Sequence, residues 1–105
     1  MAQVYSTRLF VAKGFNGVQT QSPPPGTLWI VRDIWGFWNF AGQPVTEVHV
    51  AGDVAQTFAF MQFNPVDAVQ QQFWQGRQVI LTSFTVSASG DPVDISISGY
   101  QLTLP

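Results

Sequence analysis

The amino-acid sequence predicts an all-β protein that folds as one antiparallel β-sandwich. The chain has 105 residues, which is enough for one hydrophobic core but not for two. Between its glycine, proline and asparagine clusters, β-branched and aromatic residues alternate with polar ones at the two-residue period of a strand. Several short strands with turn signals about every 8–12 residues are typical of a sandwich or barrel. We therefore expect a single-domain jelly roll over residues 1–105, with an immunoglobulin-like sandwich as the second choice.

The expected strands are short and separated by glycine- and proline-containing breaks. Residues 14–17 (Gly-Phe-Asn-Gly) predict a turn after the first strand, because asparagine and glycine tolerate positive φ. Residues 22–26 contain three consecutive prolines and predict a rigid loop between strands rather than an interdomain linker. We expect the second strand to bend or break at Gly36. The strands are expected at residues 4–12, 28–40, 45–51, 54–63, 70–80, 82–89 and 93–104.

The segment from residue 64 to residue 73 fits two structures. Pro65 stands at the first position of a candidate helix of about two turns, in which Val66, Val69 and Phe73 have helical spacing. Val69 and Phe73 also lie on one face of a strand. We favour the strand.

The last predicted strand contains a change of phase. Its apolar residues fall on odd numbers from Val93 to Ile97 and on even numbers from Tyr100 onward. One residue of slip at a glycine predicts a β-bulge at Ser98-Gly99. We expect the core-facing side of the strand to change there, with a further break at residues 90–92.

The composition excludes several classes of function. Charged residues make up 10% of the chain and Lys and Arg together number four, which is too few to neutralise a run of phosphates, so we expect no nucleic-acid partner. The absence of cysteine excludes disulfides and thiolate metal sites. The uncharged apolar runs are shorter than the ~20 residues of a membrane-spanning helix. With no recognisable signal peptide, we expect synthesis in the cytoplasm and no membrane insertion.

Few residues are suited to catalysis or metal binding. The single histidine, His49, shares a predicted strand face with Glu47. Acyl transfer also needs a serine nucleophile and an oxyanion hole, and the chain has no Gly-x-Ser-x-Gly turn. The carboxylates are scattered, and Asp91 and Asp94 flank Pro92 in a pattern typical of a turn. We expect no enzymatic activity, no catalytic or metal-binding residues and no cofactor.

An aromatic run at residues 28–40 is the most informative feature. Large apolar side chains fall on both its odd and its even positions, which indicates a strand covered on both faces. One face of a sandwich sheet meets the core, so the other is expected to meet the Pro-rich loop and chain ends, a second subunit or a sugar. Arg32 and Asp33 point to opposite faces, and each is expected to find an opposite charge on a neighbouring strand or subunit. The candidate interface residues are Trp29, Arg32, Trp35, Phe37, Trp38, Phe40, Trp74 and Arg77.

Several short pieces of the sequence carry a resemblance by their order and spacing. They are Val-Tyr-Ser-Thr-Arg at residues 4–8, Pro-Gly at 25–26, Val-Arg-Asp-Ile at 31–34, Trp-Gln-Gly-Arg-Gln-Val at 74–79 and Ser-Gly-Tyr-Gln-Leu at 98–102. The chain resembles the small β-rich minor tail proteins of long-tailed bacteriophages of actinobacteria. It departs from their pattern at residues 81–83 (Leu-Thr-Ser), where a glycine-acid turn is expected.

The resemblance implies a structural protein of the virion, made in the host cytoplasm and present in several copies at the tail tip or tube. It implies contacts with other virion proteins and with copies of the same chain, as a trimer or hexamer. In this hypothesis the aromatic candidates anchor neighbouring subunits, and Arg32 and Arg77 orient them by charge.

Two alternatives stay open. One is a capsid decoration protein, which is also a small β-domain that binds a symmetric assembly. The other is a carbohydrate-binding module for a host-surface glycan, in which exposed tryptophan rings stack on sugars while Asn39, Gln43 or Asp53 binds hydroxyl groups.

Overall fold

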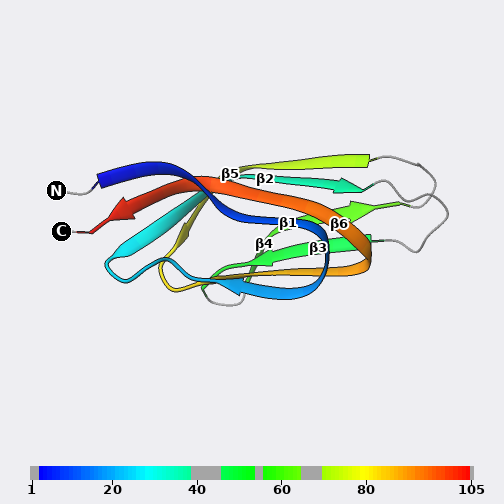
Figure 1. Cartoon of the computed structure of the whole chain (residues 1–105), viewed down its shortest axis with the longest axis horizontal. Coiled ribbons are helices and arrows are strands. Elements are labelled where there is room, and N and C mark those ends of the chain that lie inside the picture. Colours follow the sequence, from blue (N-terminus) through cyan, green and yellow to red (C-terminus); the bar gives the residue numbers. More distant parts are fainter. Residues whose placement is uncertain (1–2, 39–45, 54–55, 65–69, 105) are drawn as a thin grey trace.

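The structure is a computed structural model that describes residues 3–38, 46–53, 56–64 and 70–104. These residues form six β-strands and no helix, and every strand pairs antiparallel with its neighbours (Figure 1). The predicted all-β antiparallel sandwich is therefore confirmed. The strands are β1 (Gln3–Gln21), β2 (Thr27–Trp38), β3 (Thr46–Ala51), β4 (Thr57–Phe63), β5 (Gln70–Ile80) and β6 (Phe84–Thr103).

The strands form two layers, and β1 and β6 each take part in both. In the first, which we call layer A, the N-terminal part of β1 pairs with the C-terminal part of β6, followed by β2 and β5. In the second, layer B, residues 17–21 of β1 pair with residues 84–88 of β6, followed by β3 and β4. Layer A lies at the top of Figure 1 and layer B at the bottom.

This strand order is that of a jelly roll. A corner divides β1 and β6 into two segments each, which turns the six strands into eight segments, four in each layer. Numbered along the chain, the segments are ordered 1-8-3-6 in layer A and 2-7-4-5 in layer B. Two four-stranded antiparallel sheets that share their connections in this way contain the two Greek keys of a jelly roll. The strand order thus agrees with the first predicted topology.

The corner is built from glycines and two hydrogen bonds. Gly14, Gly17 and Gly90 have φ angles of 62°, 121° and 105°, which L side chains rarely adopt. The N–H of Gly14 donates to Oδ1 of Asp94 at 2.9 Å, and the side-chain amide of Asn16 donates to the carbonyl oxygen of Gly90. These bonds hold β1 and β6 together where both strands bend from one layer into the other (Figure 1).

The breaks predicted at this corner are wrong, since both strands continue through it. β1 extends to Gln21 instead of ending near residue 12, and the predicted strands 82–89 and 93–104 are one strand, β6. The glycines do bend the chain, but β1 and β6 pair with each other on both sides of the bend, so the hydrogen bonds between them resume after it.

The predicted break at Gly36 is also wrong, because β2 continues through this residue. A Cβ atom at Gly36 would lie 2.9 Å from Sδ of Met61 in layer B, so the glycine provides room for the opposite layer. The helix alternative is wrong for residues 70–73, which belong to β5. Residues 65–69 lie outside the described residues.

The bulge predicted at Ser98-Gly99 lies opposite these residues instead, because the extra residues belong to the two neighbouring strands. β2 has an extra residue at Arg32 and β1 has one at Leu9, whereas β6 keeps its odd-numbered residues inward through Gly99. A Cβ atom at position 99 would lie 1.9 Å from the carbonyl oxygen of Ile30. The glycine therefore permits a close approach of β2 rather than a slip within β6.

The bulge at Arg32 changes the phase of β2. Trp29 faces the core before the bulge, and Ile34 and Trp38 face it afterwards. The core-facing residues of β2 therefore change from odd to even positions. This change explains in part why large apolar side chains fall on both odd and even positions of the aromatic run.

Side-chain hydrogen bonds close the sandwich on the side away from β1. The side-chain amide of Gln72 donates to the carbonyl oxygen of Gln62, and the Gln70 side chain bonds both the N–H and the carbonyl oxygen of Asn64. Glutamines of β5 thus hold β4 where the two backbones do not pair.

The predicted rigid loop at residues 22–26 connects β1 to β2. The N–H and hydroxyl of Thr27 donate to the carbonyl oxygen of Pro24 at 3.1 and 2.6 Å, and the N–H of Leu104 donates to the carbonyl oxygen of Gly26 at 2.8 Å. The loop is therefore fixed to the C-terminal end of β6.

Candidate interaction surface

The outer side of layer A, which we call the aromatic face, exposes large apolar side chains. Its residues alternate along each strand with the residues that face the core. Strand pairing arranges them in rows across the layer. From one end to the other, the rows are Ile30, Tyr100 and Val79; Arg8, Ser98, Asp33 and Gln75; Val11, Ser96, Trp35 and Phe73; and Asp94, Phe37 and Gln71.

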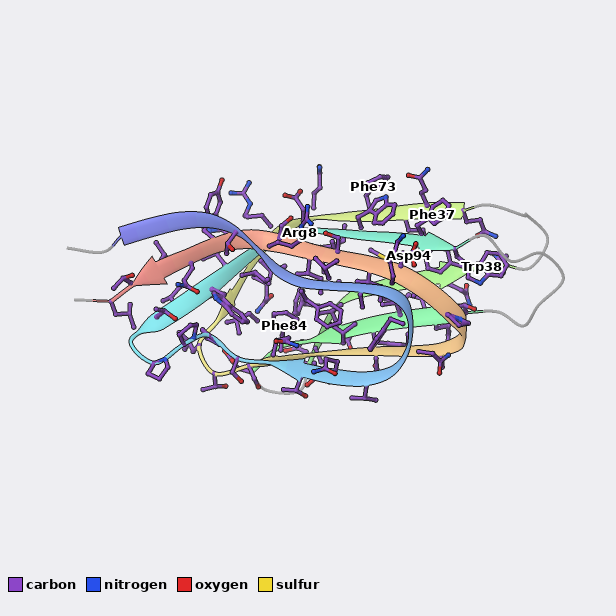
Figure 2. The ribbon with its side chains drawn as sticks, in the orientation of Figure 1. Arg8, Phe37, Trp38, Phe73, Phe84 and Asp94 are labelled. Carbon is purple, nitrogen blue, oxygen red and sulfur yellow. The ribbon has the colours of Figure 1, made fainter. Side chains whose placement is uncertain are left out.

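Three aromatic side chains dominate this face. The rings of Trp35 and Phe37 stack with their centroids 5.7 Å apart and their planes 11° apart. Nε1 of Trp35 donates to Oε1 of Gln71 at 3.3 Å, which fixes the indole ring. Phe73 lies across from Trp35 on β5 and is 67% exposed, and Figure 2 shows it on the outer side of the layer. Trp35 and Phe37 are half-buried. Partly exposed aromatic rings held in place by neighbours are typical of interface residues.

A groove of about 360 Å³ lies beside Trp35. It lies over the small outward side chain of Ser96 on β6, between larger side chains of β1 and β2. Val11, which is 53% exposed, lies on the opposite side from Trp35. The lining residues are Arg8, Val11, Ala12, Lys13, Trp35, Asp94, Ile95 and Ser96.

The charges on this face are few and exposed. Arg8 and Asp33 lie in one row with Ser98 between them. Arg32 extends over the ring of Tyr100, with its guanidinium carbon 5.8 Å from the ring centroid. Within the described part of the chain, no ion pair is formed by Arg32 or Asp33. The opposite charges predicted for them are therefore not supplied by neighbouring strands.

The outer side of layer B carries both polar and apolar side chains. Glu47 and His49 of β3 and Ser87 of β6 lie there, together with Val18 of β1 and Phe60 of β4, which are 70% and 49% exposed. His49 packs edge-on against Phe60, with ring centroids 4.7 Å apart. No hydrogen bond joins Glu47 to His49 among the residues that the structure describes, and over those residues no three metal-ligating side chains gather. None of the described residues forms a helix that is long and apolar enough to cross a membrane.

Two predicted interface residues lie in the core. Trp38 is 1% exposed, and its ring stacks on Phe63 with centroids 6.3 Å apart. Trp29 contacts the ring of Phe84 at 5.7 Å, and its Nε1 donates to Oε1 of Gln101 at 3.0 Å. Figure 2 shows Phe84 between the two layers. Burial within one chain leaves these two indole rings no surface for a neighbour, which corrects the prediction for them.

The other predicted residues are divided between the surface and its edges. Trp35 and Phe37 lie together on the aromatic face. Arg32 and Arg77 are exposed at the irregularity between β2 and β5. Trp74 is half-buried on the inner side of β5, packed edge-on against Phe58 at 5.4 Å. Phe40, Asn39 and Gln43 lie outside the described residues.

Sequence reasoning missed the residues that complete the face. Phe73, Val11 and Ile30 surround Trp35 and Tyr100 only because β1, β2, β5 and β6 are adjacent in layer A. Phe73 was considered within a segment that fitted a strand or a helix. The adjacency of bulky Phe73 and Trp74 on opposite faces of one strand was the available signal.

Asp53 is a structural residue rather than a ligand-binding one. Its carboxylate accepts the N–H groups of Leu81, Thr82 and Ser83 at 2.8, 2.8 and 3.0 Å and the Thr82 hydroxyl at 2.9 Å. Desolvation raises the pKa of Asp53, but these hydrogen bonds outweigh it and lower the pKa to about 2. The acid expected in the turn at residues 81–83 is thus provided by the loop after β3. Its oxygens are occupied, so Asp53 is not assigned to a glycan.

Comparisons with known proteins give little. No family model matches the chain, and no curated protein matches it. Among solved structures, those of infectious bursal disease virus strains Gx and Gt contain chains similar to this one, at 14% and 9% identity with TM-scores of 0.36 and 0.33. The matches cover 99% and 98% of this chain, which spans about a third of those chains (32%). The jelly-roll assignment comes from the strand order instead.

Proposed function

We propose that this protein is a non-enzymatic structural component of a virion that assembles in several copies through its aromatic face. The observation that carries the proposal is the cluster of Trp35, Phe37 and Phe73 on the outer side of layer A, where Phe73 is 67% exposed and the other two rings are half-buried. Aromatic residues are enriched, and charged residues depleted, in the centres of protein interfaces. Apolar side chains gathered in one row across four strands are the pattern of a surface that a neighbour covers.

The sequence resemblance supports a finer proposal, a minor tail protein of a bacteriophage located at the tail tip or tube. A capsid decoration protein uses the same kind of surface and is the closest alternative. Jelly rolls occur in viral capsid and lectin domains, and a fold shared by several functions does not select one. Immunogold labelling of intact virions with an antibody to this chain distinguishes tail from head.

The direct test is the mass of the purified chain in solution, measured by size-exclusion chromatography with light scattering over about a hundredfold range of concentration. We expect a closed oligomer that dissociates on dilution. Trp35→Ser should shift it to the monomer, whereas Ser87→Ala on the outer side of layer B should not. A chain that stays monomeric at every concentration contradicts self-assembly through this face.

Carbohydrate binding is a second candidate, favoured by the groove of about 360 Å³ beside Trp35. Its volume lies within the ~300–1,000 Å³ of small-molecule sites. A sugar stacked on Trp35 would quench tryptophan fluorescence, while the buried Trp29 and Trp38 would not respond. Titration with soluble glycans, with Trp35→Phe as the control, tests this candidate.

A further inference from the structure

The aromatic face contains a ridge and a groove side by side, one strand apart. The ridge is on β2, where Asp33, Trp35 and Phe37 point outward. The groove lies over β6, where Ser96 and Asp94 stand in the rows of Trp35 and Phe37. A ridge beside a groove on one face is the shape that a two-fold, self-complementary contact requires, because each copy then offers both halves of the fit.

The register states which residues meet. Consider a 180° rotation about an axis that lies parallel to the strands between β2 and β6, just outside the face. This operation keeps each row and exchanges the two strands, so Trp35 of each copy lies over Ser96 of the other. Sheets that pack face to face cross at about 30°, so the alignment holds for the rows at the centre of the contact.

The same rotation brings β5 of one copy over β1 of the other. In the row of Trp35, Phe73 then lies opposite Val11. These two side chains are 67% and 53% exposed in the single chain, so the contact covers the most exposed apolar residues of the row. In the next row but one, Ile30 lies over Tyr100 of the second copy.

The charges agree with this arrangement. Asp33 of one copy lies over Ser98 of the other, and Arg8 stands next to Ser98 on β1. Arg8 and Asp33 are both exposed, and in the described ranges of one chain neither forms an ion pair. The rotation gives each of them an opposite charge one strand away, within reach of the long arginine side chain.

The area is sufficient for a stable contact. Four strands spaced ~4.8 Å apart, with about ten residues at ~3.3 Å each, give a face of roughly 600 Å² in projection. Corrugated side chains bury more than the projected area, and a standard interface buries about 800 Å² per partner.

We propose that a second copy of this chain docks on the aromatic face in a two-fold contact, in which Trp35 of each copy fills the groove over Ser96 of the other and Arg8 pairs with Asp33 across the interface. The proposal rests on assembly through this face and specifies its geometry. It requires a dimer, or a hexamer made of three dimers.

The test is a charge exchange in the full chain. Arg8→Asp and Asp33→Arg each place like charges together, and each should weaken the self-association by at least tenfold. The double variant R8D/D33R restores the pairing and should return to within about threefold of the unchanged protein. Light scattering over the concentration series measures all four, and circular dichroism confirms that each is folded.

A second measurement uses the absence of cysteine from the sequence. Asp33→Cys and Ser98→Cys chains, alone or mixed, should be joined by a short bis-maleimide, because both positions lie next to the two-fold axis. Ser87→Cys on layer B, alone, is the matched control and should give no joined product.

The outcomes separate this inference from the proposed function. A trimer, or a double variant as weak as the weaker single variant, overturns the two-fold geometry. If all four chains associate equally, assembly stands but uses another surface, and the inference is wrong. If the unchanged chain is a monomer throughout, both proposals fail.

Discussion

The two outer faces of this jelly roll differ, although the same long strands, β1 and β6, run through both layers. Layer B presents polar side chains such as Glu47 and Ser87 between isolated apolar ones, whereas layer A presents Trp35 and Phe73 side by side. Both layers bury their inner sides in one core. An outer face without clustered aromatic rings is therefore sufficient for this fold. We infer that the space between the layers provides stability, and the proposed interaction uses the outer side of layer A.

The strongest test of this division compares two tryptophans of β2. Trp38 is buried against Phe63, so Trp38→Ala should lower the free energy of unfolding by about 3–5 kcal/mol, the usual cost of removing a large core side chain. Trp35 lies on the aromatic face, so Trp35→Ala should cost less than half as much while weakening association. Thermal unfolding followed by circular dichroism measures the first effect. Equal losses of stability would contradict the assignment of core and surface.

Gly99 tests the close approach of β2 and β6 that determines which residues of β2 face outward. A Cβ atom there would lie 1.9 Å from the carbonyl oxygen of Ile30, so Gly99→Ala should destabilise the fold by at least the ~1–3 kcal/mol typical of overpacking. The adjacent Ser98→Ala points outward and should change stability by less than ~0.5 kcal/mol. Urea unfolding of both variants is the measurement, and similar midpoints would show that the strands can separate at little cost.

The contact between β2 and Gly99 also shows what could be predicted from the sequence. Two-residue alternation is a local property, and it is sufficient to predict strands and a sandwich, as the three prolines are for the loop at residues 22–26. The phase of β2 is not local, because the bulge at Arg32 depends on how β2 lies against Gly99. Trp35 and Trp38 therefore could not be sorted into surface and core before the pairing was known.

The corner illustrates the same limit. Glycine and asparagine at residues 14–17 have equal local preference for a tight turn and for a bent strand. The choice between them depends on hydrogen bonds to Asp94 and Gly90, which are more than seventy residues away (|i−j| of 80 and 74). The aromatic face likewise requires four strands from distant parts of the chain to lie side by side.

Asp53 provides a smaller effect that belongs to neither face. It joins the loop after β3 to the turn before β6 through four hydrogen bonds, and its pKa is lowered from 3.8 to about 2. The unfolded chain therefore binds a proton at higher pH than the folded one, so the stabilisation is complete above about pH 4 and is lost as the pH falls through 2.

Asp53→Asn should lower the free energy of unfolding at neutral pH by about 1–2 kcal/mol, since it removes a charged acceptor. The difference in melting temperature between this variant and the unchanged chain should shrink as the pH is lowered from 4 to 2. Asp33→Asn is the control. Asp33 is exposed, and its carboxylate forms no hydrogen bond with any of the described residues. A constant difference across that pH range would contradict the role of the ionised carboxylate.

The smallest expected change in stability gives the sharpest comparison of the two faces. Phe73 on layer A and Phe60 on layer B are both exposed phenylalanines on strands at the ends of their layers, 67% and 49% exposed. Replacing either by serine removes little buried area, so each should change the free energy of unfolding by about 0.5 kcal/mol or less. Their effects on self-association should nevertheless differ, with Phe73→Ser weakening it at least tenfold and Phe60→Ser leaving it unchanged. Sedimentation velocity at matched concentrations distinguishes the two, because equal loss in both variants would mean that exposed apolar area in general, and not the aromatic face of layer A, drives assembly.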